Sequence, residues 1–330
     1  MVTRLRRENR NEVALALAVI AMAIAVGTAD SAFWSLGTVG DVLRDMVVPL
    51  PLALGVLLIL LSSGIDVSFA SIAIFSAYAT VNLVDAFHIP GIVLPVLCAS
   101  LIGAVLGAIN AVVVAGLMLP TLIATLATRG LFSGVLLMAL GAIDIGTLPG
   151  ELPEWSNRYL LTLGSGAQAM RLHVFVLPVV ALAIGLAWFC ARTASGRNLY
   201  AVGGDADAAR RLGIPVRRVQ AAAFVVAGTV CGLAGLMYVV LARHANPHDL
   251  MGTELDVVAA VILGGAAVSG GRGTVLGTVL GVLLVSLMQN SLTLLGIPGL
   301  WQRVALGALL LIGMAVQVTA QRAKDREVSV

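Results

Sequence analysis

The chain has little charge for its length. Of its 330 residues only 11% are charged, whereas 59% are hydrophobic. Soluble domains average about 25% charged and about 45–50% apolar residues, so this chain lacks the polar surface of a cytosolic enzyme or a secreted domain. A disordered chain is excluded as well, because disorder requires low hydrophobicity. A lipid bilayer must therefore solvate much of the protein.

Lysine and cysteine are also scarce. Lys324 is the sole lysine, and the arginines that carry the remaining positive charge occur in short clusters between apolar runs. This distribution is typical of membrane topology signals rather than of a phosphate-binding surface, so no nucleic-acid partner is expected. Cys98, Cys190 and Cys231 lie in apolar runs at spacings that fit neither a metal site nor a disulfide framework. We interpret them as small buried side chains.

Long uncharged runs predict an all-α polytopic membrane protein. A spanning helix needs about 20 apolar residues. We expect ten spans, at 13–29, 46–65, 67–84, 91–115, 119–141, 172–191, 219–242, 257–271, 273–302 and 304–321. The first run follows an arginine cluster and resembles a signal peptide, but the further spans favour an uncleaved first helix.

The arginine asymmetry predicts the orientation. Placing the N-terminus in the cytoplasm puts fourteen basic residues inside and five outside. The transmembrane domain then covers 13–321, between cytoplasmic tails at 1–12 and 322–330. A cytoplasmic loop lies at 193–217 and an outward loop at 142–171.

The cytoplasmic loop contains the signals of a short helix at about 206–212. Asp205 is a good N-cap, Asp207 and Arg210 complement the helix dipole, and Gly213 suits the position after the helix. Two turns are too few to be stable in water, so either a partner docks here or the segment is a solvated linker. The candidate docking segment comprises Gly203, Gly204, Asp205, Asp207, Ala208, Ala209, Arg210, Arg211 and Gly213.

A carboxylate interrupts the apolar sequence at Gly64-Ile65-Asp66-Val67-Ser68. Because an acid at the centre of a bilayer costs about 2.5–3.5 kcal/mol, we place Asp66 at the inner end of the second span. It either caps a tight turn between helices or takes part in the transport path.

A glycine-rich stretch follows Glu254-Leu255-Asp256 and runs from Gly264-Gly265 to Gly273. It lacks the Gly-Lys-Ser/Thr ending of a phosphate loop, so we interpret the glycines as sites of close backbone approach. The span at 257–271 is short and interrupted by glycine, which in transporters is typical of irregular helices near the pathway.

Two asparagines predict an internal repeat. Asn110 and Asn290 each precede a glycine by six residues, with a proline soon after. The two spans that contain them run in opposite directions in the predicted topology. This relation is the one expected of an inverted five-plus-five repeat.

From about residue 45 to 320 the chain resembles the permease subunits of bacterial ABC sugar importers, in the branch for ribose, xylose, rhamnose and autoinducer 2. The ordered motifs that carry the resemblance are Gly64-Ile65-Asp66-Val67-Ser68, Asn110 with Pro120 and Thr125-Leu126-Ala127-Thr128, Gly196-Arg197 with Tyr200-Ala201-Val202-Gly203-Gly204 and Ala208-Ala209-Arg210, Glu254-Leu255-Asp256 with Leu263-Gly264-Gly265 and Ser269-Gly270-Gly271-Arg272-Gly273, and Asn290 with Gly296-Ile297-Pro298 and Trp301-Gln302.

The resemblance implies a mechanism and partners. Two permeases, identical or related, form the pore in the inner membrane, and a soluble binding protein delivers the substrate from outside. A separate cytoplasmic ATPase uses ATP-Mg and docks on the segment equivalent to 205–213. This chain would then bind no cofactor or metal and would not itself be an enzyme.

Arg129 departs from the family pattern, which has an apolar residue there and an arginine nearer Ser133. It lies ten residues into its predicted span, or about 15 Å, close to the midplane. Arg129 either lines the pore or pairs with Asp66 or another subunit, or it replaces the family's arginine one turn away. The pathway or helix-break candidates are Gly64, Asp66, Ser68, Asn110, Thr125, Arg129, Gly264, Gly265 and Asn290.

Three other functions would also require a polytopic membrane protein. An ion-coupled transporter usually carries more ionisable residues inside the membrane than Asp66 and Arg129. An intramembrane enzyme would need a nucleophile with a base or a set of metal ligands, and no such pattern occurs. A related permease for branched-chain amino acids or nucleosides remains open, and the residues do not identify the substrate.

Overall fold

The computed structural model describes residues 2–164, 169–298, 301–302, 304–309 and 311, and within them the chain is mainly helical. The predicted tail at 322–330 lies outside the described residues. In chain order the elements are α1 (Val2–Ala29), η1 (Ser31–Trp34), α2 (Leu36–Asp45), α3 (Pro49–Ser62), α4 (Phe69–Phe87), α5 (Val93–Ala111), η2 (Val112–Gly116), α6 (Thr121–Leu140), α7 (Leu152–Trp155), β1 (Tyr159–Leu163), β2 (Met170–His173), α8 (Val176–Arg192), α9 (Ala194–Gly204), α10 (Ala206–Arg211), α11 (Val216–Ala242), α12 (Glu254–Leu263) and α13 (Val275–Leu294).

The helices confirm a polytopic all-α membrane protein but not the number of spans. Among the described residues six helices are long and apolar enough to cross a membrane, and eight if the bent pairs α2–α3 and α8–α9 each count as one span. Two of the ten predicted spans, at 257–271 and 304–321, are not among these eight helices or helix pairs. Helix α12 has ten residues, about 15 Å and thus about half of a bilayer core. The span at 304–321 lies largely outside the described residues.

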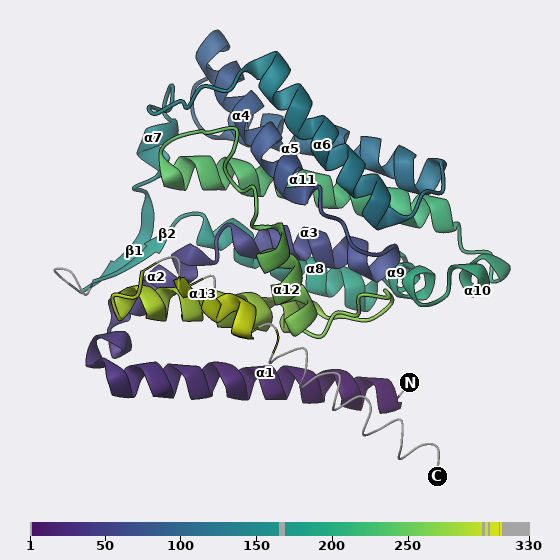
Figure 1. Ribbon diagram of the computed structural model, residues 1–330, viewed down its shortest axis with the longest axis horizontal. Coiled ribbons are helices and arrows are strands. Elements are labelled where there is room, and N and C mark those ends of the chain that lie inside the picture. The colour runs from purple at the N-terminus through teal and green to yellow at the C-terminus, as the bar shows by residue number, and fades with distance from the viewer. Residues whose placement is uncertain (1, 165–168, 299–300, 303, 310, 312–330) are drawn as a thin grey trace.

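Helix α3 lies at the centre of the bundle. Every residue from Leu50 to Ser62 is buried, which fits a sequence that is apolar on all sides. Figure 1 shows α5, α6 and α11 on one side of α3, and α13 with α1 on the other. Contacts with α4, α9, α11, α12 and α13 surround it.

Helices α5 and α11 pack unusually closely because both carry glycines at four-residue spacing. A Cβ on Gly103 would contact the Gly228 carbonyl oxygen, and a Cβ on Gly228 would contact the Gly103 carbonyl oxygen. Gly107 and Gly232 extend the same contact along the two helices. Small residues at this spacing let helix backbones approach in membranes, where packing rather than the hydrophobic effect drives association.

The loop at 142–171, which the sequence predicted to face outward, contains a feature that the sequence did not predict. Strands β1 and β2 form an antiparallel hairpin, with Leu161 opposite Leu172. The hairpin departs from the expected purely helical fold, because the segment at Tyr159 is only five residues of apolar and β-prone character and too short to be recognised among loops. It packs against α2.

The molecule has two ends that differ in structure. Helices α9 and α10 lie at one end, together with the start of α1 (Figure 1), and we call this the α10 end. The hairpin, α2 and α7 lie at the other, which we call the hairpin end. The predicted topology assigns the same grouping, since it places residues 1–12 and 193–217 on one side of the membrane.

Candidate functional site

The short helix predicted at 206–212 is confirmed as α10, Ala206–Arg211. The Asp205 carboxylate accepts hydrogen bonds from the amides of Asp207 (3.0 Å) and Ala208 (2.9 Å), as an N-cap does. Arg210 lies 2.8 Å from the Asp207 carboxylate. Gly213, at φ 80°, follows the helix in the left-handed conformation that the sequence suggested.

Backbone contacts hold the end of α9, which leads directly into α10, against α3 and the glycine-rich turn. A Cβ on Gly203 would contact the Leu61 carbonyl oxygen of α3 and lie 2.6 Å from the Gly271 amide nitrogen. The Tyr200 hydroxyl donates to the Gly273 carbonyl at 3.0 Å. The glycine-rich turn therefore serves close backbone approach, as the sequence indicated, and it rigidly supports the segment that leads into α10.

The face of α10 that points away from the helix bundle is exposed to solvent. The side chains of Asp207 and Arg210 are 74% and 63% exposed. Leu212, the first residue after the helix, is 79% exposed, and no described residue packs over it. This face of α10, with two charged side chains and Leu212, is therefore accessible to a protein partner.

Replacing Asp205 by alanine should loosen α10 without unfolding the protein. Hydrogen bonds from the Ala208 and Asp207 amides lower the pKa of Asp205 below its ordinary 3.8, so the charged carboxylate is the stabilising form. The cap is therefore fully present above pH 3.8 and is lost as the pH falls through the lowered pKa. In Asp205→Ala, hydrogen exchange at the Asp207 and Ala208 amides should be several-fold faster at pH 7.

Asp205→Asn is the matched control, because asparagine caps helices as well as aspartate does. Its exchange at the same two amides should stay near that of the unmodified protein. Equal protection in Asp205→Ala and Asp205→Asn would contradict the capping role.

A second site is a buried polar cluster at the break between α3 and α4. The Ser68 amide and hydroxyl both donate to Asp66 Oδ1 at 2.7 Å, and Asn110 Nδ2 of α5 donates to the Ser68 hydroxyl at 2.7 Å. The Val67 amide donates to Thr125 Oγ1 of α6 at 3.3 Å. Together with Gly64 in the same turn, five of the predicted candidates therefore lie together at the α10 end.

The geometry supports the turn-holding interpretation of Asp66. Its carboxylate bonds the backbone two residues on, which is the pattern of an Asx turn, and Gly64 adopts φ 119° just before it. Asp66, Asn110 and Thr125 are at most 1% exposed. Asn110 Oδ1 is buried without a hydrogen-bond partner among the described residues. The cluster thus links α3–α4, α5 and α6 at one point.

Arg129 pairs with Glu254, so the expected alternative of a pair with Asp66 is wrong. The Arg129 guanidinium lies 2.8 Å from Glu254 Oε1. The Glu254 side chain is 5% exposed and that of Arg129 36%. Arg129 stands eight residues after Thr121, about 12 Å into α6, so the ion pair lies near the middle of that helix.

Each carboxylate oxygen of Glu254 contacts a partner. Its Oε2 accepts the Gly252 amide at 2.7 Å, while Oε1 faces Arg129. It is the first residue of α12, where the helix dipole favours a negative charge. Glu254 belongs to one of the motifs of the sequence, but its role as the partner of Arg129 was not predicted. The available signal was that an intramembrane arginine requires an acid on another helix.

Three predicted candidates lie elsewhere. A Cβ on Gly264 would lie 2.6 Å from the Gly277 carbonyl oxygen of α13, and Gly265 turns the chain at φ 93°. Asn290 Nδ2 donates to Asp45 at 3.3 Å, at the hairpin end. The structure does not bring these residues to the polar cluster.

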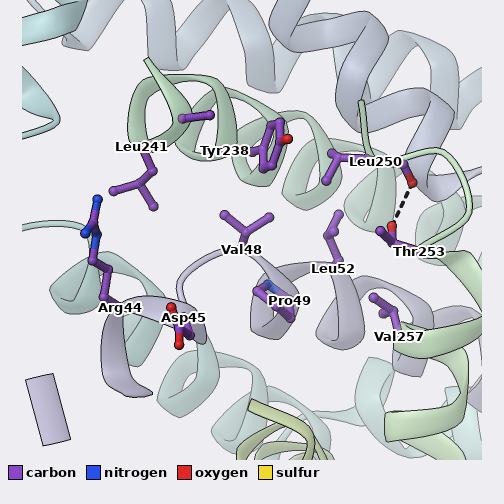
Figure 2. A pocket seen from close by; sticks show the side chains of 11 residues that line it. Arg44, Asp45, Val48, Pro49, Leu52, Tyr238, Leu241, Leu250, Thr253 and Val257 are labelled. Atoms are coloured by element: carbon purple, nitrogen blue, oxygen red, sulfur yellow. Dashed lines mark hydrogen bonds between the residues drawn. The ribbon is translucent and has the colours of Figure 1, made fainter. Parts of the chain in front are cut away.

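Two hollows lie at the hairpin end. One, of about 370 Å³, opens between α2, α3, α11 and the start of α12 (Figure 2). The other, of about 360 Å³, lies between α2 and α13. Arg44 and Asp45 line both hollows. Of the lining residues, Asn290 and Gln302 belong to a motif that the sequence indicated, whereas the others carry no local motif.

Comparison with known proteins identifies the family. A family model described as "Branched-chain amino acid transport system / permease component" matches residues 38–314. The chain is 33% identical to the autoinducer 2 import system permease protein LsrC of Salmonella typhi over 311 residues, which cover 94% of this chain and 86% of the relative. It is 33% identical to the protein of the same name from Escherichia coli K12 / DH10B, over 92% of this chain and 86% of the relative.

No solved structure matches the chain. The family model nevertheless covers the bundle from α2 to the last described helical residues, and the relatives align over nearly the whole chain. The resemblance expected from the ordered motifs is thereby confirmed. The chain belongs to the family of branched-chain amino acid transport system permease components, and it is a membrane transport subunit of that family.

Proposed function

We propose that this chain is the transmembrane permease subunit of an ATP-driven, binding-protein-dependent importer for a sugar-like small molecule, with autoinducer 2 as the first candidate substrate. The observation that carries the proposal is the similarity, over 94% of the chain, to permeases named for autoinducer 2 import. The family description names branched-chain amino acids. Similarity along the whole chain favours the sugar-like substrate over that alternative.

The ATPase partner would dock on α10. The helix is too short to be stable alone, is held by backbone contacts behind it and is open in front. In this arrangement ATP-Mg binds the partner subunit, and this chain binds no nucleotide, cofactor or metal. A second permease, identical or related, would complete the pore, and a binding protein would deliver the substrate at the hairpin end.

The full topology would comprise ten spans with both termini in the cytoplasm of a bacterial inner membrane. Helix α12 would be a half-length span between α11 and α13, and 304–321 the tenth. The two asparagines support an inverted five-plus-five repeat. Asn110 donates to Ser68 at the α10 end, and Asn290 donates to Asp45 at the hairpin end. Each amide thus bonds a residue beside a helix break, at opposite ends.

Exchanging the charges on α10 should release the ATPase. The double variant Asp207→Arg with Arg210→Asp keeps the net charge, an opposite-charge pair at i, i+3 and the Asp205 cap, but its charges oppose the helix dipole. Unchanged amide exchange at Ala208 therefore has to accompany the test, to show that the helix persists. The face presented to a partner is reversed in sign. We expect at least a tenfold loss of co-purified ATPase from membranes in mild detergent, whereas Arg158→Gln in the outward loop should lose none.

The decisive experiment is purification of the tagged chain from its native membranes. We expect a cytoplasmic ATPase in the eluate, whose hydrolysis rises when the cognate binding protein and autoinducer 2 are added. The eluate also distinguishes a homodimer from a pair of related permeases. If uptake persisted without any associated ATPase, an ion-coupled transporter would replace the importer.

A further inference from the structure

The N-terminal helix α1 lies along one side of the bundle, where it packs against α13 (Figure 1). The family model begins at residue 38, so α1 lies outside the part of the chain that the model matches. Leu15 and Met22 of α1 share an apolar cluster with Leu284 of α13. The start of α1 lies at the α10 end, beside the glycine-rich turn of residues 264–273.

Glu12 of α1 bonds the threonine that directly follows this turn. Thr274 Oγ1 donates to Glu12 Oε1 at 2.6 Å, a length typical of a hydroxyl bonded to a carboxylate. The same hydroxyl accepts the Gly277 amide at 2.9 Å, because Thr274 is the N-cap of α13. The Glu12 carboxylate therefore lies at the N-terminus of α13, where the helix dipole favours a negative charge.

The neighbouring residue of α1 contacts the other end of the turn. A Cβ on Gly265 would lie 3.5 Å from Asn11 Nδ2, and Gly265 turns the chain at φ 93° directly after α12. Two adjacent residues of α1, Asn11 and Glu12, thus lie against the beginning of the turn and against the residue just past its end. Helix α1 therefore fixes both ends of the glycine-rich turn.

The middle of the turn contacts the segment before α10. A Cβ on Gly270 would lie 2.7 Å from the Gly203 carbonyl oxygen, and a Cβ on Gly203 would lie 2.6 Å from the Gly271 amide nitrogen. The Tyr200 hydroxyl donates to the Gly273 carbonyl at 3.0 Å. Backbones packed this closely transmit displacement, so the turn and the end of α9 should move together.

We propose that Glu12 is a positioning residue for energy coupling. It fixes the glycine-rich turn to α1, and the turn in turn supports the segment on which the ATPase would dock. The inference rests on the proposed function and adds α1 to the elements that transmit the movement of the ATPase. Glu12 is half-buried directly before the apolar run that begins at Val13. Packing alone would be served by an apolar residue, without the cost of burying a polar group.

Hydrogen exchange on the purified full-length chain in detergent tests the contact without any partner. The Asp205 amide bonds the Ala201 carbonyl, and the Gly270 amide bonds the Ala267 carbonyl. In Glu12→Ala we expect exchange at these two amides to be at least threefold faster, because the turn loses its bond to α1. Glu12→Gln should stay near the unmodified protein, since the glutamine carbonyl oxygen accepts the same hydroxyl proton.

ATP hydrolysis by the assembled complex tests the coupling. The readout is the ratio of hydrolysis with the cognate binding protein and autoinducer 2 to hydrolysis without them. We expect Glu12→Ala to lower this ratio at least fivefold and Glu12→Gln to preserve it. Met22→Ala is the matched control, because it weakens the packing of α1 ten residues, or about 15 Å, further along the helix. Met22→Ala should lower the melting temperature but preserve the ratio.

The two measurements separate this inference from the proposed function. Unchanged exchange in Glu12→Ala would overturn the positioning role, and so would an equal fall of the ratio in Met22→Ala, which would reduce α1 to a stabilising helix. If the unmodified protein showed no stimulated hydrolysis while Glu12→Ala still exchanged faster, the proposed importer would be overturned and the contact between Glu12 and the turn supported.

Discussion

Gly228→Ala should prevent stable folding. The alanine Cβ would contact the Gly103 carbonyl oxygen and lie 2.9 Å from the Gly107 Cα, both of which are backbone atoms of α5. Backbone atoms cannot rotate away, so α5 and α11 would have to separate. Overpacking a core costs about 1–3 kcal/mol, and here we expect the upper end or more. The helix preference of alanine over glycine, about 1 kcal/mol, does not offset this cost.

The measurement is the amount of monodisperse protein after detergent extraction, together with its melting temperature. We expect Gly228→Ala to reduce the monodisperse fraction several-fold. Gly134→Ala in α6 is the matched control, because nothing lies within 4 Å of its added Cβ. That variant should be as stable as the unmodified chain or slightly more so. Equal behaviour of the two variants would show that the α5–α11 contact does not limit folding.

We expect Arg129→Leu to lower the stability of the protein strongly, though less than Gly228→Ala does. Arg129→Leu leaves the Glu254 carboxylate buried at 5% exposure, with the Gly252 amide as its one remaining partner within the described part of the chain. Removing one member of a buried ion pair costs about 3–5 kcal/mol. Because Arg129 is itself 36% exposed, we expect about 2–3 kcal/mol and a melting temperature lower by several degrees in detergent.

A second substitution separates the ion pair from the lost side chain. In the double variant Arg129→Leu with Glu254→Gln no unpaired charge remains, so most of the stability should return. Arg218→Leu, at an exposed position of α11, controls for losing an arginine in general and should leave the melting temperature unchanged. If the double variant were as unstable as Arg129→Leu alone, the cost of burying an unpaired carboxylate would not be the cause.

In the same variants we expect transport activity and melting temperature to change independently. The Arg129–Glu254 pair anchors the first turn of α12, whose other end leads to the turn against Gly203. The stable double variant should therefore retain its fold and still transport poorly, because α12 is no longer tied to α6. Normal uptake by that variant would limit the pair to a stabilising role.

Several features follow from local sequence alone. The apolar runs predict the positions of the long helices, since a bilayer selects hydrophobic segments one at a time. Helix α10 is predicted because Asp205, Arg210 and Gly213 act within one or two turns of their own position. The turn at Asp66 is predicted for the same reason, because its carboxylate bonds the amide only two residues away.

Other features depend on packing between distant segments. Arg129 pairs with Glu254 rather than Asp66, because its side chain reaches from α6 to the first residue of α12 in the folded chain. The glycines of α5 and α11 have the spacing of a helix contact, but only the fold shows that they face each other. The two hollows that Arg44 and Asp45 line arise where α2 meets α3 and α11 on one side and α13 on the other. Caps and spans are satisfied within their own segments, whereas ion pairs, close helix contacts and cavities require the relative placement of helices, which only tertiary structure decides.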